Sequence, residues 1–140
     1  MRPLMIFAVL ATLLPAAASA NSFRAYNDLT VLPQSNSTFE VVISRGEGAR
    51  GVWCAAADYA VRALGFQGRI YVLEARAASR TVAGRNSVIF TTNVNVLPQG
   101  PSRSVSVTTS DVGNGLPVNH AIQFCRGNNI ELGDRILFRK

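Results

Sequence analysis

The sequence predicts an α+β domain in which two helices pack on one face of an antiparallel sheet of four to six strands. Several segments alternate apolar and polar residues, which is the pattern of half-buried strands, and one segment has the spacing of a buried helix face. With 48% hydrophobic and only 16% charged residues, the composition excludes a disordered chain. A length of 140 residues fits one folded domain.

Residues 1–20 have the pattern of a cleaved signal peptide. A basic residue near the start precedes an uncharged run over residues 4–14, and small residues follow, with Ala18 and Ala20 spaced as A-x-A. The apolar stretch is shorter than the roughly 20 residues that a membrane span needs. We therefore expect residues 21–140 to form a single periplasmic or secreted domain, with no transmembrane segment after cleavage.

In the first half of the domain, the sequence predicts two strands. A short strand is expected over residues 27–32, and a clearer one over residues 38–44. In the second, Phe39 and Ile43 share one face and Glu40 lies on the other.

Residues 52–64 are the best helix candidate. The predicted apolar face combines residues at positions i, i+3, i+7 and i+10: Cys54, Ala57, Val61 and Leu64. Asp58 and Arg62 have the i, i+4 spacing of an ion pair, which we expect on the exposed side of the helix. Gly65 follows where a helix-ending glycine belongs.

Three further strands are expected in the second half. Residues 69–75 are apolar on both faces near their middle, which favours a central strand, and residues 87–94 have strong β propensity. Residues 103–109 alternate cleanly, which predicts a third strand in an antiparallel meander. Its inward-facing side chains would be Val105, Val107 and Thr109.

Residues 117–126 allow two interpretations. The alternation of Val118, His120, Ile122 and Phe124 would suit a strand. A helix that Pro117 opens and Gly127 closes explains both ends of the segment as well as its middle, and is favoured. Residues 130–138 are consistent with a closing strand or a short hairpin.

The two cysteines, Cys54 and Cys125, predict a disulfide. In an oxidising compartment an even pair is most simply bonded, and only one pairing exists. In the helical interpretation of residues 117–126, the bond would join helix to helix over one face of the sheet.

No motif in the chain predicts a metal or a cofactor. His120 is the only histidine, and there is no C-x-x-C, H-E-x-x-H, phosphate-binding or calcium-binding loop. The few carboxylates are scattered, and no two have a spacing that forces them into one site. We therefore assign no catalytic residue in the leading interpretation.

The alternative is a thiol hydrolase in which Cys54 is the nucleophile and His120 its base, acting on cell-wall peptides. In this respect the chain resembles exported cell-wall peptidases of the CHAP type. It departs from them because Trp53 and the residues after Cys54 are apolar, and because a catalytic thiol would leave Cys125 unpaired.

The mature chain is basic. After cleavage it keeps 13 basic and 8 acidic residues, a net charge of +5, and the arginines are spread along the sequence without a run. This distribution predicts a solvated basic surface and no specific nucleic-acid site, unless the fold gathers several arginines on one face. A positive exported protein adheres to anionic envelope polymers.

The segments Trp53-Cys54-Ala55-Ala56, Asp58-Tyr59-Ala60 and Arg69-Ile70-Tyr71, with the late Cys125, resemble a group of small exported bacterial proteins of uncharacterised function. The resemblance implies export and paired cysteines, and no activity. The leading hypothesis is a non-catalytic exported domain that binds a cell-envelope component, such as an anionic polymer, or an exported partner protein.

Overall fold

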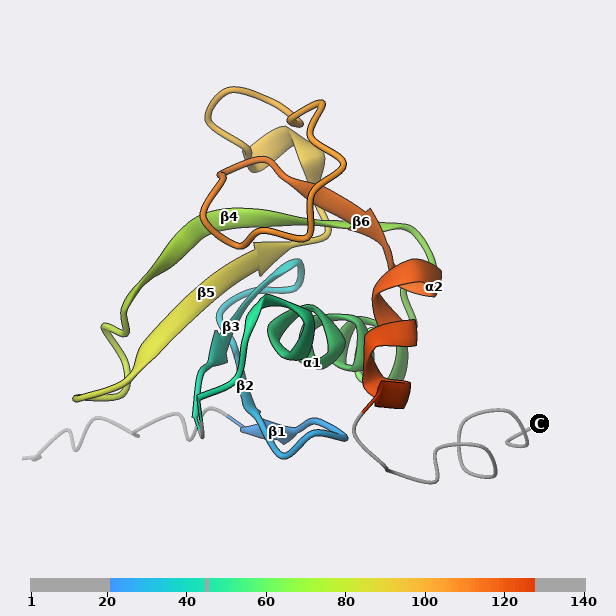
Figure 1. Cartoon of the computed structure of the whole chain (residues 1–140). Coiled ribbons are helices and arrows are strands. Elements are labelled where there is room, and N and C mark those ends of the chain that lie inside the picture. Colours follow the sequence, from blue (N-terminus) through green and yellow to red (C-terminus); the bar gives the residue numbers. More distant parts are fainter. Residues whose placement is uncertain (1–20, 45, 128–140) are drawn as a thin grey trace, which may run out of the picture.

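The computed structural model describes residues 21–44 and 46–127, and there it contains a six-stranded sheet (Figure 1). All strand pairs are antiparallel, and the order across the sheet is β1-β2-β3-β5-β4-β6. The strands are β1 (Phe23–Arg24), β2 (Thr30–Pro33), β3 (Thr38–Val42), β4 (Arg69–Ala78), β5 (Asn86–Thr91) and β6 (Gly115–Pro117). The signal peptide predicted over residues 1–20 and the closing strand predicted over residues 130–138 lie outside the described residues.

The helices lie together on one side of this sheet (Figure 1). They are α1 (Ala49–Arg62), α2 (Val118–Ala121) and η2 (Ile122–Gly127), a 3-10 helix that continues α2; a further 3-10 turn, η1 (Val94–Val96), lies in the long loop after β5. The predicted α+β class is confirmed, and so is the helical interpretation of residues 117–126. None of the helices in the described part of the chain is long and apolar enough to cross a membrane.

Helix α1 forms the centre of the core. Trp53 is fully buried, and its ring meets that of Phe90 on β5 edge-on, at 5.0 Å between centroids. At the end of the helix the Phe66 amide donates to the Ala60 carbonyl at 2.8 Å. This bond wraps the chain around Gly65, whose φ of +62° is the left-handed conformation expected of a helix-ending glycine.

The predicted disulfide between Cys54 and Cys125 is present, with 5.0 Å between the Cα atoms. Both residues are buried, on α1 and η2 respectively. The bond therefore joins the central helix to the C-terminal one, as the sequence predicted.

The prediction of a strand over residues 103–109 is wrong, because these residues form part of a loop. Val105, expected in the core, is 94% exposed, whereas Thr109 is buried. The reason is that side-chain hydroxyl groups in this segment bind the backbone amides that a neighbouring strand would otherwise bind. Alternate hydroxyl oxygens accept from the amide two residues further on, which satisfies those amides without a neighbouring strand. The four acceptors are Ser102, Ser104, Ser106 and Thr108.

Two finer expectations also need correction. Strand β4 is interior, between β5 and β6, but only its Ile70 and Val72 are buried, so it has one apolar face and not two. Asp58 and Arg62 do form an ion pair, but Asp58 is completely buried. It is covered because the N-terminal segment crosses this side of α1, where the Tyr26 amide donates to its carboxylate at 2.9 Å.

Replacing both cysteines tests how much the cross-link stabilises this arrangement. The bond joins residues 71 positions apart, and in the chain-entropy model a loop of that size contributes about 4 kcal/mol. We expect the double variant Cys54→Ala/Cys125→Ala to unfold in urea with a free energy lower by about that amount. A loss below about 1 kcal/mol would contradict this role of the bond.

Candidate functional site

The face of the sheet that α1 does not cover carries two glutamates in one cross-strand row. In the strand register Glu40 of β3 lies opposite Ile89 of β5, and Ile89 lies opposite Glu74 of β4. We call this the outer face. The spacing of these two acids in the sequence does not predict their proximity, because it depends on the order of β3, β5 and β4 in the sheet.

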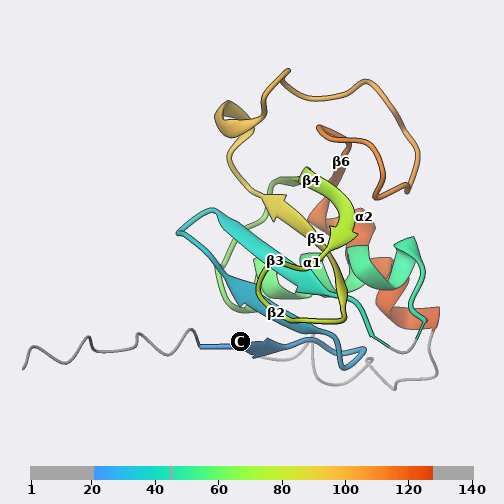
Figure 2. The same ribbon diagram turned by 90° about the vertical axis from the view of Figure 1, so that its left-hand side faces the viewer.

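The loop between β4 and β5 folds over the outer face. Figure 2 shows it crossing the sheet in front of β3. Strand β4 shifts register twice, between Val72 and Glu74 and between Glu74 and Ala77. Such irregularities bend a strand and increase its twist, which brings the tip of this hairpin across β5.

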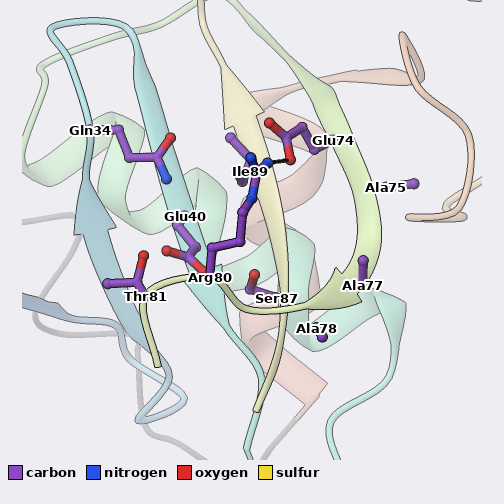
Figure 3. Close-up of a pocket in the computed structure, with 10 residues that line it drawn as sticks. All are labelled: Gln34, Glu40, Glu74, Ala75, Ala77, Ala78, Arg80, Thr81, Ser87 and Ile89. Carbon is purple, nitrogen blue, oxygen red and sulfur yellow. Dashed lines mark hydrogen bonds and ion pairs between the residues drawn. The ribbon is translucent and has the colours of Figure 1, made fainter. Parts of the chain in front are cut away.

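Glu40 is the centre of the arrangement (Figure 3). Glu40 is only 1% exposed, and the hydroxyl of Ser79 in the loop donates a hydrogen bond to its Oε1 at 2.5 Å. That length is typical of a hydroxyl bound to an ionised carboxylate. Within the described residues, Oε2 receives no hydrogen bond of standard geometry. The Thr81 and Ser87 hydroxyls nevertheless lie close enough to the carboxylate to lower its pKa.

These neighbours keep Glu40 charged. Burial of the carboxylate raises its pKa, but the hydroxyls of Ser79, Thr81 and Ser87 and the positive charge of Arg80 outweigh burial. The net pKa of Glu40 therefore lies below its ordinary value of 4.5. Stabilisation of the charged form by hydrogen bonds and an opposite charge is the physical cause.

Arg80 connects the two acids. Its side chain runs from the region of Glu40 past Ile89 to Glu74, with which it forms an ion pair (Figure 3). The pair is exposed, at 76% for Arg80 and 50% for Glu74, so water screens it and its contribution to stability is small.

The space between these side chains is small. The cavity measures about 30 Å³, enough for one or two water molecules. An ionised Glu40 is also unsuited to act as a general acid, which would need a raised pKa. The arrangement holds the β4–β5 loop against the sheet through the bond between Ser79 and Glu40.

The same hairpin carries three exposed arginines, Arg76, Arg80 and Arg85. Arg80 pairs with Glu74, whereas no acidic side chain of the described residues forms an ion pair with Arg76 or Arg85. The fold thus gathers some of the distributed arginines on one element. Sequence spacing gave only a weak signal, because residues 76–85 contain three arginines without forming a run.

The residues of the hydrolase alternative do not form a nucleophilic site. Cys54 is buried and its sulfur is bonded to Cys125, so it has no thiolate to attack a substrate. His120 is exposed on α2, where its ring meets that of Phe124 edge-on at 5.5 Å. The part of the chain that the structure describes also holds no group of three or more His, Cys, Asp or Glu residues placed for a metal ion.

Acidification tests the buried charge. Because folding lowers the pKa of Glu40, its stabilising contribution is present above pH 4.5, its ordinary value, and is lost as the pH falls below that value. At pH 7 we expect Glu40→Gln to be about 1 to 3 kcal/mol less stable than the native protein in urea unfolding. The gap should narrow as the pH approaches 3, and a gap that stays constant from pH 7 to pH 3 would contradict a charged Glu40.

Comparison with known proteins finds no family model, no curated protein and no solved structure that matches the chain.

Proposed function

We propose that this protein is a non-catalytic exported domain that binds an anionic component of the cell envelope through the β4–β5 hairpin. The observation that carries the proposal is the placement of Arg76, Arg80 and Arg85 on this one hairpin, where all three are exposed. The hairpin extends away from the helices that cover the other side of the sheet (Figure 1).

Guanidinium groups suit this role. Each is always charged and can donate two parallel hydrogen bonds to a carboxylate or phosphate. Arg76 and Arg85 are free to do so because they form no ion pair with an acid in the described residues. A flexible polymer with several negative charges can contact both, and the net positive charge of the chain attracts it from a distance.

Export is supported by two separate observations. The N-terminal sequence has the pattern of a signal peptide, and the buried disulfide is of a kind that persists in oxidising compartments. The proposed location is the periplasm or the space outside the cell. The disulfide argues against the thiol hydrolase, since Cys54, its candidate nucleophile, is bonded to Cys125.

Polyanion binding tests the proposal. We expect native protein to bind labelled polyphosphate, or a polycarboxylate such as polyglutamate, in fluorescence anisotropy, with an affinity that falls as salt is added. Arg76→Gln/Arg85→Gln should weaken binding about tenfold, because two charge-assisted contacts are lost.

The matched control is Arg103→Gln/Arg126→Gln, which removes the same charge from two exposed arginines outside the hairpin. It should weaken binding about twofold at most, through the net charge alone. An equal loss in both variants would mean that overall charge and not the hairpin attracts the polymer. Absence of binding by the native protein would favour an exported protein as the partner.

A further inference from the structure

We propose that Glu40 is the positioning residue of the arginine site, holding the tip of the β4–β5 hairpin in its binding conformation through Ser79. The inference rests on the proposed function and adds to it the residue that organises the site. Glu40 itself is 1% exposed and so does not contact the polymer. It acts from β3, the strand that pairs with β5 of the hairpin, and reaches the loop through the Ser79 hydroxyl.

One hydroxyl group links Glu40 to the loop. The Ser79 hydroxyl donates to Glu40 Oε1, and its oxygen accepts from the Thr81 and Val82 amides at 3.1 and 3.0 Å. A serine hydroxyl has one donor and two acceptor positions, so this arrangement uses its full capacity. The shape of the turn and its attachment to the sheet therefore depend on the same side chain.

The loop is closed by its backbone at the same place. The Ser79 amide donates to the Arg85 carbonyl at 2.8 Å, and the Arg85 amide donates to the Val82 carbonyl at 3.4 Å. Arg80 follows Ser79 directly, and Arg85 lies at the other end of the closed loop. Release of Ser79 from Glu40 would consequently detach this closed loop from β3, and Arg85 would no longer be held in place relative to the sheet.

The negative charge of Glu40 is what allows it to orient the Ser79 hydroxyl. An ionised carboxylate can only accept hydrogen bonds, so it fixes the direction in which the Ser79 hydroxyl points and leaves both of its lone pairs for the amides. A glutamine at this position would present an NH₂ group that competes for the same hydroxyl oxygen.

Two variants break the link in different ways, and both can be studied in the full protein. Ser79→Ala removes the hydroxyl, whereas Glu40→Gln keeps it and removes the charge. Ser79→Thr restores a hydroxyl and serves as the rescue variant. Ser104→Ala is the matched control, because the Ser104 oxygen also accepts from an amide two residues on but lies in the long loop after β5, outside residues 79–85.

Hydrogen exchange and polyphosphate binding are measured on each variant. We expect Ser79→Ala and Glu40→Gln to accelerate exchange of the Thr81 and Val82 amides at least about fivefold. Both should also weaken polyphosphate binding several-fold, while Ser79→Thr and Ser104→Ala behave as the native protein. Arg76→Gln/Arg85→Gln should weaken binding and leave the exchange of these amides unchanged.

Three other outcomes are possible, and each would overturn a different part of the proposal. Unchanged amide exchange in Ser79→Ala would overturn the role of this hydroxyl in holding the loop. Faster exchange with unchanged affinity would overturn the positioning role while leaving the proposed function intact. Failure of the native protein to bind any polyanion would overturn the proposed function and the positioning role with it.

Discussion

The fold depends on the burial of the whole middle part of helix α1. Its residues from Gly51 to Ala60 are all buried, although most surface helices bury a single stripe. The small residues Ala55, Ala56 and Ala57 allow neighbouring elements to approach closely, and Trp53 fills the space against the sheet. The sheet, the C-terminal helices and two connecting segments therefore all meet on this one helix.

Enclosure requires that the polar groups around α1 find partners. The Trp53 indole donates to the Val107 carbonyl at 2.8 Å, which attaches the long loop after β5 to the core. On another side, the buried Asp58 binds Arg62 and the backbone of Tyr26. The Arg62 guanidinium, whose side chain is 39% exposed, in turn lies 4.2 Å from the ring centre of Tyr26 and so pairs with the buried Asp58 from the rim of the core.

The sequence predicted the parts of the fold that depend on short repeating patterns of apolar residues or on a single possible partner. Strand alternation over residues 38–44, the helical spacing of residues 52–64 and the pairing of Cys54 with Cys125 each depend on short patterns or on a single possible partner. Ser104 and its neighbours show where such patterns fail, because alternation of hydroxyl and apolar residues also suits an extended segment that satisfies its own amides.

The candidate site could not be predicted for a different reason. The position of Glu40 on the outer face followed from alternation, but its burial depends on a loop that is about 40 residues later in the chain and that folds over it. The grouping of Arg76 and Arg85 likewise became visible only once the hairpin was defined, since neither has a charged neighbour in sequence. Long-range contacts of this kind leave no local signal.

Mapping where a polyanion contacts the protein is the most direct test of binding at the β4–β5 hairpin. In a two-dimensional amide NMR titration with short-chain polyphosphate, we expect the largest shift changes within residues 74–87, with the buried amides of α1 unaffected. Shift changes concentrated in the long loop over residues 92–114, or spread evenly over every exposed arginine, would contradict a binding site on the β4–β5 hairpin.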